Sequence, residues 1–322
     1  TDISATRIAG LGRSVSPLAD LKAFFGLIKT IKTFKPDVIH THTAKAGVLG
    51  RLASIIAGRG ATRIHTFHGH LLHGYFSSFK TSLVIAIEKF LAARTHFLVA
   101  IGNEVKQDLI NAGIGSAKQY KVFFPGLPTP HTAGKAELRQ KLGLDAAKIY
   151  CTFVGRLTQI KRPDRLLDIA SAMQARGVAL EFLVAGEGEL FAQSQTRAKS
   201  ENLPVTFLGW RKDIDDLFAA SDIAILTSDN EGIPLTLIQA AQAGLPIIAP
   251  KVGSISDIVE NDVTGFLTSP APGAMASALS ALATDEKLRI QLGGAGEKRA
   301  SELFSLERML RDHTEIYHLA HR

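Results

Sequence analysis

Cysteine is almost absent from this chain, since Cys151 is the only one among 322 residues. A disulfide within the chain is therefore excluded, and the composition fits a reducing cytoplasm. Cys151 opens an apolar run at 151–154, so we expect it to be a small core residue.

Long apolar runs are also missing. No stretch approaches the roughly 18 uninterrupted apolar residues of a membrane-spanning helix, because the best candidate, 82–87, is followed by Glu88 and Lys89. No signal peptide is visible either, although we expect the N-terminus to be truncated. The sequence therefore predicts a cytoplasmic protein.

Acidic residues are scarce in the first part of the chain. Residues 1–145 hold 19 Lys and Arg against 8 Asp and Glu, whereas the remaining residues hold 18 against 22. Such asymmetry suggests a nucleic-acid face, an anionic-membrane face, or a set of scattered, solvated lysines. Nucleic acid is disfavoured because aromatic residues make up only 7% and the basic residues form no recognised binding module. A peripheral position at the inner face of the cell membrane is the better alternative.

Hydrophobic residues are plentiful, at 46%, and they follow a repeating pattern. Short apolar runs alternate with longer amphipathic stretches, which is typical of parallel α/β sheets wound on both faces. We expect strands at 37–40, 63–67, 97–100, 121–124, 150–154, 180–184, 205–208, 223–226, 247–249 and 265–267, and helices that include 18–34, 44–57, 78–93, 272–283, 286–303 and 306–320.

The proline-rich segment 125–130 can continue neither a strand nor a helix. It therefore predicts two domains, 1–130 and 131–305, followed by a terminal helix within 306–322. The first domain is expected to lack one or two leading βα units.

The segment 231–240 is the most informative in the chain. It follows the expected strand 223–226, so Glu231 lies on a loop at the end of a strand, where open α/β sheets bind ligands. Pro234 suits the first turn of the next helix, which leaves the N–H groups of Leu235 and Thr236 free for an anion. Gln239 shares a helix face with Thr236 and is expected to contact a more distant hydroxyl group.

The loop 155–162 follows the first strand of the second domain. Its cations, Arg156, Lys161 and Arg162, are suited to clamping a diphosphate, although they could equally be exposed loop charges. Gly186 begins a Gly-x-Gly after the next strand. Because the third glycine of the dinucleotide fingerprint is missing, we reject NAD binding and expect only a tight turn near a ligand.

Six histidines fall within 40–73: His40, His42, His65, His68, His70 and His73. His-x-His pairs can bind zinc, but no cysteine or evident carboxylate cluster accompanies them, so no metal site is predicted. His68 and His70 better suit hydrogen bonding to a polar substrate, with ordinary core or surface roles as the alternative. The segment 41–47, with His42 and Lys45, begins a helix and either caps it or contacts a substrate.

These motifs, in this order, resemble the family 4 glycosyltransferases of the GT-B fold, especially bacterial enzymes that build cell-surface polysaccharides. The resemblance covers essentially the whole chain. It rests on the segments 36–42, 66–70, 154–157 with Lys161, 231–234, 253–259 and 264–267.

The resemblance implies two Rossmann-like, doubly wound domains that face a central cleft, with the second domain binding a nucleotide sugar. It implies that the final helix packs back on the first domain. The residues expected to act in catalysis are His68, Glu231, Arg156 and Lys161. Those expected to bind the donor are Gly155, Arg156, Lys161, Gly186, Glu231, Gly232, Ile233, Pro234, Leu235, Thr236 and Gln239, and those on the acceptor side are His42, Lys45 and His70.

The reaction implied by the resemblance retains the anomeric configuration and needs neither a metal nor another cofactor. A hexose or N-acetylhexosamine would pass from a nucleotide sugar, most commonly of UDP, to a lipid-linked or growing glycan. The main chemical demand is then to stabilise charge on the leaving group.

Two features depart from the family pattern. Gln239 stands where the family has a second glutamate that accepts hydrogen bonds from ribose, so we expect weaker or altered nucleotide affinity that Gln239→Glu would improve. The glycine-rich loop of the family's N-terminus is also missing. Two other functions therefore stay open: a catalytically weak sugar-nucleotide-binding partner, and a nucleotide-sugar 2-epimerase of related fold.

Overall fold

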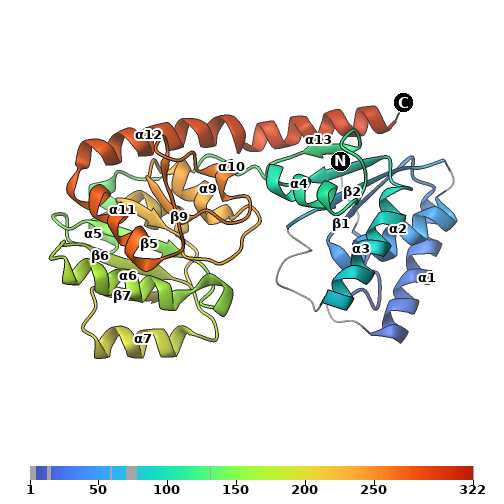
Figure 1. Cartoon of the computed structure of the whole chain (residues 1–322). Helices are drawn as coiled ribbons and strands as arrows, with labels where there is room; N and C mark the ends of the chain where they lie inside the picture. Colours follow the sequence, from blue (N-terminus) through green and yellow to red (C-terminus); the bar gives the residue numbers. More distant parts are fainter. Residues whose placement is uncertain (1–4, 13–15, 59, 70–77, 131, 322) are drawn as a thin grey trace. The chain divides into compact units, whose positions relative to one another are not determined.

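The computed structural model describes residues 5–12, 16–58, 60–69, 78–130 and 132–321. The chain divides into two compact units, Thr1–Phe124 with Leu310–Arg322, and Pro125–Met309 (Figure 1). The boundary between the two units lies at the start of the proline-rich segment 125–130, whereas the sequence predicted a boundary at residue 130.

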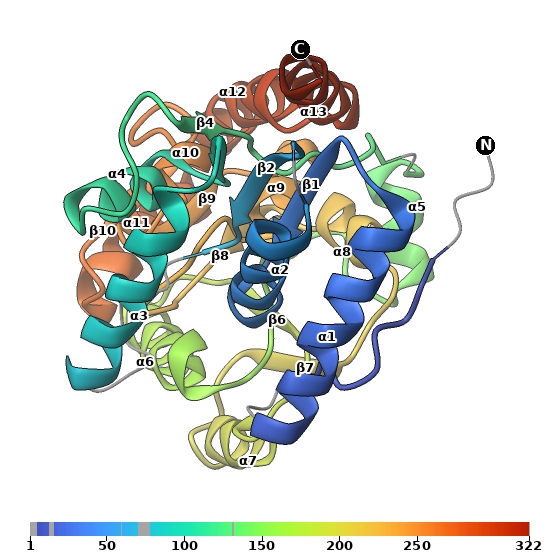
Figure 2. The same cartoon turned by 90° about the vertical axis from the view of Figure 1, so that its right-hand side faces the viewer.

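The first unit is built on four parallel strands in the order in which they occur along the chain. They are β1 (Val38–His42), β2 (Thr62–Phe67), β3 (Phe97–Ala100) and β4 (Tyr120–Val122). Four helices lie between or before them: α1 (Pro17–Phe34), α2 (Ala44–Ala57), α3 (Ser78–Ala92) and α4 (Asn103–Asn111). Helix α2 packs on both α1 and α3 (Figure 2).

Both faces of the two central strands of this sheet, β2 and β3, are largely buried. Phe67 and Leu98 pack against α3 and α4 on one face, while Ile64 and Val99 on the other face pack against Ile316. Ile316 belongs to α13 (Leu306–Ala320), the last helix, whose residues from Leu310 onward are part of the first unit. The bounds of α13 are those predicted from the sequence.

The second unit holds a six-stranded parallel sheet with the order β10-β9-β8-β5-β6-β7. Its strands are β5 (Tyr150–Val154), β6 (Glu181–Ala185), β7 (Val205–Gly209), β8 (Ile223–Ile225), β9 (Ile247–Pro250) and β10 (Gly265–Thr268). The chain moves outward from β5 to β7 and then returns to β8 on the other side of β5. The strand order therefore reverses between β5 and β8.

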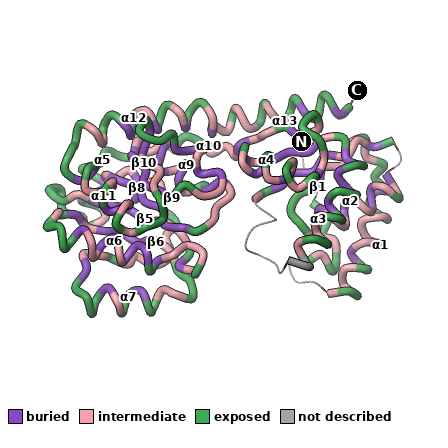
Figure 3. The backbone as a smooth tube through the Cα atoms, in the orientation of Figure 1, coloured by how far each residue is buried: buried purple, intermediate pink, exposed green. Residues whose placement is uncertain are grey.

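The helices of the second unit cover both faces of this sheet. They are α5 (Lys135–Lys141), the short 3-10 helix η1 (Gln159–Lys161), α6 (Pro163–Ala175), α7 (Phe191–Ser200), α8 (Ile214–Ala220), α9 (Leu235–Gln242), α10 (Ile255–Ile258), α11 (Pro272–Thr284) and α12 (Glu286–Leu303). Phe153 and Phe182 are completely buried in the larger core with α6 and α11, and Leu183 packs with α8 on the opposite face. Figure 3 shows buried segments along the strands of this sheet.

Cys151 is a free, fully buried thiol in β5, as expected from its apolar run. Burial raises its thiol pKa, because the thiolate would lose its hydration, so it is a core residue and not a nucleophile. Within the described part of the chain, no helix combines the length and the apolar character needed to cross a membrane.

Candidate active site

Two polar loops lie at the point where the strand order of the second sheet reverses. One follows β5 and carries Arg156 and Lys161, and the other follows β8 and carries Glu231. Open α/β sheets bind ligands outside the carboxyl ends of their strands at such a switch point. The topology therefore gathers these three predicted donor residues at one edge of one sheet.

Lys161 and Glu231 are in direct contact. The Lys161 Nζ forms an ion pair with Glu231 Oε1, and the side chains are 20% and 10% exposed. Ser228 Oγ donates to the same oxygen at 2.6 Å, which fixes the orientation of the carboxylate. Arg156 is exposed and forms no ion pair with any residue that the structure describes. Of the two predicted phosphate-binding cations, Arg156 thus has no ion-pair partner among the described residues, whereas Lys161 is paired with Glu231.

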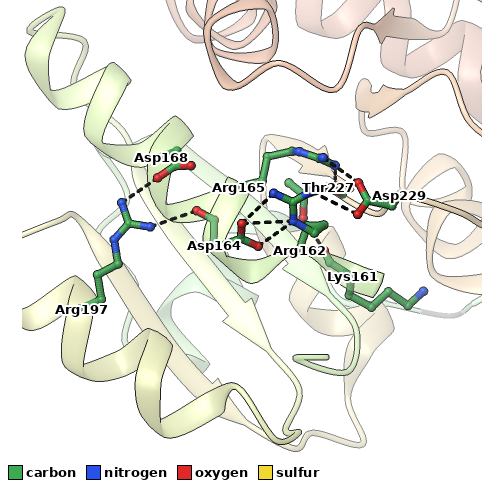
Figure 4. A network of polar contacts seen from close by, with 8 residues as sticks. All are labelled: Lys161, Arg162, Asp164, Arg165, Asp168, Arg197, Thr227 and Asp229. Carbon is green, nitrogen blue, oxygen red and sulfur yellow. Dashed lines mark hydrogen bonds and ion pairs between the residues drawn. The ribbon is translucent and has the colours of Figure 1, made fainter. Parts of the chain in front are cut away.

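A network of arginines and aspartates ties the two loops together (Figure 4). Arg165 is buried, and its guanidinium donates to Thr227 O at 2.5 Å and to Asp229 Oδ1 at 2.6 Å. Thr227 Oγ1 in turn donates to Lys161 O at 2.8 Å. These bonds join α6 and η1 to the loop after β8, so they hold Lys161 beside Glu231.

Arg162 belongs to this network and not to a phosphate clamp. Its guanidinium lies 2.8 Å from Asp164 Oδ2 and 3.1 Å from Asp229 Oδ2. Hydrogen bonding to Asp164 is the main reason that the pKa of Arg162 is raised. The sequence suggested Arg162 as a third diphosphate ligand, but its two carboxylate partners already satisfy its charge.

Two glycines let backbone segments approach each other around the site. A Cβ on Gly186, whose φ is +138°, would lie 1.9 Å from Gly155 O, so the turns after β5 and β6 touch through their main chains. A Cβ on Gly253, whose φ is +52°, would lie 1.8 Å from Glu231 O. The loop after β9 therefore packs against the backbone of Glu231, and only glycine permits this approach.

Helix α9 begins one position later than the sequence suggested. Pro234 is the N-cap residue, with an extended ψ of 113°, and the first helical residue is Leu235. Proline cannot supply a capping side chain, and no side-chain cap bond is made at this end. The N–H groups of Leu235 and Thr236 at the start of α9 are therefore available to a ligand. Gly232 and Ile233 form the short connection from Glu231 to this helix end.

Gln239 has a partner that the sequence did not indicate. Its Nε2 donates to Asp215 Oδ1 in α8 at 2.8 Å. Gln239 and Thr236 lie on the half-exposed side of α9, whereas the neighbouring Leu237 and Ile238 are buried. Asp215 and Ser228 are polar residues without a recognisable motif, so only their three-dimensional contacts reveal them.

The first unit carries a histidine cluster at the carboxyl ends of β1 and β2. His42 Nδ1 and His68 Nε2 are 2.9 Å apart and share one hydrogen. His40 stacks near His42, with ring centroids 4.2 Å apart, and it bonds Tyr317 at 2.8 Å and Thr66 at 2.7 Å. His42 and His68 thus form a hydrogen-bonded pair, whereas His40 bonds Tyr317 of α13.

The pKa values of these histidines are lowered. For His68 the cause is partial burial, and for His42 it is burial followed by repulsion from His68 and His313. Burial and the neighbouring imidazoles lower the pKa of His40 to about 3. All three are therefore neutral near pH 7. In the described residues, no group of three His, Cys, Asp or Glu side chains is arranged to hold a metal ion.

Lys45 and His70 are the other two residues predicted on the acceptor side. Lys45 forms an ion pair with Asp20 of α1, so its charge is already used within the unit. Thr43 is the N-cap residue of α2 but makes no side-chain cap bond, so the expected capping by this segment is wrong. His70 lies outside the described residues.

Two family models match the two parts of the chain. Residues 5–130 match Glycosyltransferase Family 4, and residues 134–299 match Glycosyl transferases group 1. The chain belongs to glycosyltransferase family 4. Its fold is the GT-B fold predicted from the sequence, with two parallel sheets and interleaved helices.

The relatives of this glycosyltransferase include bacterial polysaccharide enzymes. It is 32% identical over 278 residues to the UDP-Gal:alpha-D-GlcNAc-diphosphoundecaprenol alpha-1,3-galactosyltransferase of Escherichia coli. This match covers 82% of this chain and 70% of that protein. It is 24% identical to the capsular polysaccharide biosynthesis glycosyltransferase CapM of Staphylococcus aureus, covering 94% of this chain and 82% of CapM.

The glycosyltransferase also resembles solved structures. HepE of Anabaena in complex with UDP has a TM-score of 0.82 and 26% identity, covering 94% of this chain and 84% of HepE. The same protein in complex with UDP-glucose has a TM-score of 0.80 and 25% identity, with the same coverage.

Proposed function

We propose that this glycosyltransferase moves a hexose or N-acetylhexosamine from a UDP-sugar to a lipid-linked or growing surface glycan. The proposed reaction retains the anomeric configuration and uses no metal or other cofactor. The names of two similar proteins support the substrates: the E. coli relative takes UDP-Gal and a diphosphoundecaprenol-linked sugar, and HepE binds UDP and UDP-glucose.

The contact between Lys161 and Glu231 carries this proposal. A carboxylate oriented by Ser228 is suited to accept hydrogen bonds from sugar hydroxyls, and an adjacent ammonium is suited to a phosphate. Arg156 supplies the second cation, and the N-terminus of α9 supplies amide donors. A nucleoside diphosphate sugar presents these two kinds of group, hydroxyls and phosphates, side by side.

The chemical step exchanges one bond at the anomeric carbon for another. The acceptor oxygen forms a bond to this carbon on the face from which the diphosphate leaves, and the acceptor proton passes to the departing phosphate oxygen. Lys161, Arg156 and the α9 amides stabilise the charge that develops on the diphosphate. His68 is assigned to the reacting centre, and His42, Lys45 and His70 to the acceptor side.

A membrane-facing role is proposed for α1. Its solvent side carries apolar residues in the first half, Leu18, Leu21 and Phe25, which are 84%, 53% and 59% exposed. Exposed lysines continue the same side in the second half, at Lys29 and Lys32. Apolar residues followed by cations suit a surface of anionic lipid, which is where a lipid-linked acceptor would lie. These features support the proposed position of the enzyme at the cytoplasmic face of the membrane.

The decisive experiment measures turnover of a UDP-sugar with and without a polyprenyl-diphosphate-linked sugar acceptor. We expect a glycosylated product only when the acceptor is present, and we expect it also when a chelator removes divalent metal ions. NMR should show that the new glycosidic bond has the same anomeric configuration as the donor. Glu231→Ala should lower kcat/KM by about 100-fold, because a hydrogen bond to a charged group is lost. Glu302→Ala, at an exposed position of α12, is the matched control and should have no effect.

Each alternative function gives a different result in this assay. An epimerised nucleotide sugar without transfer would identify an epimerase, and UDP-sugar binding without turnover would identify a binding partner. An unchanged rate for Glu231→Ala would overturn the role assigned to that carboxylate.

A further inference from the structure

The hydrogen bond between Gln239 and Asp215 fixes how the glutamine presents its amide. Gln239 Nε2 faces Asp215 Oδ1 at 2.8 Å, and the reverse orientation would set two acceptor oxygens against each other. The glutamine carbonyl oxygen therefore points away from Asp215. It is an acceptor held in one direction by a neighbouring carboxylate.

Asp215 differs from the other acidic residues around the start of α8. Asp213 pairs with Arg211, and Asp216 pairs with Lys141 at 2.8 Å. Among the described residues, Asp215 forms no ion pair, and its side chain accepts a hydrogen bond from Gln239. It lies in the first turn of α8, which begins beyond the carboxyl end of β7. An incompletely neutralised carboxylate thus stands at the ligand-binding edge of the sheet.

We propose that Asp215 and Gln239 form a composite acceptor site for two adjacent hydroxyls of the donor nucleotide. The inference rests on the proposed function, and it adds Asp215 as a binding residue. Gln239 contributes its carbonyl oxygen, and Asp215 contributes the negative charge that a glutamate at position 239 would otherwise provide. Ribose is the part of a nucleoside diphosphate that presents two neighbouring hydroxyl donors.

This arrangement reverses the expectation for Gln239→Glu. The sequence alone predicted that this change would strengthen nucleotide binding. With Asp215 Oδ1 at 2.8 Å from the amide nitrogen, however, it would bring two carboxylates together, and one of them would have to be protonated or move away. We therefore expect the single variant to bind UDP more weakly than the wild type.

Asp215→Asn tests the charge of the site directly. The variant keeps the size of the side chain but loses the charge, so we expect UDP to bind about tenfold to 100-fold more weakly, as when a hydrogen bond to a charged group is lost. The double variant Asp215→Asn/Gln239→Glu exchanges the amide and the carboxylate. It should recover most of the affinity that Gln239→Glu alone has lost.

The experiment is isothermal titration calorimetry of the full chain with UDP and with a UDP analogue that lacks both ribose hydroxyls. The penalty of Asp215→Asn should appear with UDP and disappear with the analogue, which a merely structural effect would not produce. Asp216→Asn is the control, because its carboxylate pairs with Lys141 and should not affect either ligand.

Equal penalties of Asp215→Asn for the two ligands, or no recovery in the double variant, would overturn the composite site. The proposed function would survive that outcome if the enzyme still bound UDP and Glu231→Ala still lowered kcat/KM for transfer by about 100-fold. Failure of the wild type to bind UDP would overturn the composite site and the proposed UDP-sugar donor together.

Discussion

At the scale of single residues, the proposed donor site depends on contacts that could be predicted from the sequence only in part. Lys161 and Glu231 could be predicted because each follows an apolar strand at a recognisable spacing. Their direct ion pair and the hydrogen bond from Ser228 could not, because both depend on how two loops far apart in the chain pack together. Arg162 was predicted to contact a ligand because of its position in the loop. In the structure, its guanidinium instead pairs with the carboxylates of Asp164 and Asp229.

Gly253 provides a test of how the Glu231 loop is held. Gly253→Ala places a Cβ 1.8 Å from Glu231 O at a φ of +52°. We expect the free energy of unfolding to fall by at least about 1–2 kcal/mol, the cost of a left-handed alanine, and UDP-sugar affinity to fall with it. Urea denaturation and calorimetry measure the two effects.

Gly294→Ala is the matched control for this substitution. Gly294 lies within α12, and a Cβ there meets nothing within 4 Å. Because alanine favours the helix, this variant should be more stable by up to about 1 kcal/mol and should keep its affinity. Equal behaviour of the two variants would contradict the close packing of Gly253 on Glu231.

At the scale of elements, α2 and α3 are joined by a buried ion pair. Arg51 and Glu88 are 1% and 2% exposed, and Arg51 Nη2 lies 2.8 Å from both carboxylate oxygens. In the sequence, Glu88 only interrupts an apolar run, and nothing in that run identifies its partner. The helix bounds were predictable from periodicity, whereas this pairing needs the folded arrangement of both helices.

Glu88→Gln should destabilise the first unit strongly. The variant leaves the Arg51 guanidinium buried without a counter-charge, and such losses cost about 3–5 kcal/mol. Urea denaturation followed by far-ultraviolet circular dichroism measures the change. Glu260→Gln removes the partner of Arg299 in a surface ion pair and should change stability far less. A similar small effect for both variants would show that the buried pair is not needed.

The strands β1 and β2 carry histidines that should make the first unit sensitive to acid. Burial, followed by repulsion from neighbouring imidazoles, lowers the pKa of His40 to about 3. Burial, followed by the charge of Arg51, lowers that of His65 to about 2. In the unfolded chain these histidines bind a proton as the pH falls through about 6.5, while in the folded chain they stay neutral. The unfolded state then holds more protons, so stability falls as the pH drops from about 6.5 toward 3.

The urea midpoint should therefore be lower at pH 5 than at pH 7. His40→Gln should reduce this difference, because it removes one of the groups that take up a proton on unfolding. His318→Gln, at an exposed position of α13, should leave the difference as in the wild type. A urea midpoint that does not change between pH 5 and pH 7 would show that these histidines are not held neutral in the folded chain.

At the scale of the whole molecule, charge and function are unevenly distributed along the chain. The excess of Lys and Arg lies in residues 1–145, whereas the contacts of the proposed donor site lie within Pro125–Met309. The charge asymmetry was plain from the sequence. The sequence did not show which cations share a surface with exposed apolar residues. The exposed residues of α1 supply that information.

Binding to lipid vesicles tests the membrane role of α1. The enzyme should sediment with vesicles that contain phosphatidylglycerol and not with pure phosphatidylcholine, and high salt should weaken the binding. Replacing Lys22, Lys29 and Lys32 with Gln should reduce the partition coefficient by about 100-fold, at about 1 kcal/mol per lysine. Replacing three exposed cations of the second unit, Lys199, Lys287 and Lys298, is the control and should have little effect. Equal losses in the two triple variants would contradict a specific role for α1.

The reversal of strand order between β5 and β8 has an evolutionary consequence. Because the loops that meet there belong to one unit, under the proposed function a few substitutions in Pro125–Met309 change donor preference while the surface of the first unit stays as it is. If the first unit holds the acceptor, as proposed, gene fusions that exchange this portion between relatives inherit donor preference from one parent and acceptor preference from the other. Such recombination would diversify surface sugars without the emergence of a new fold.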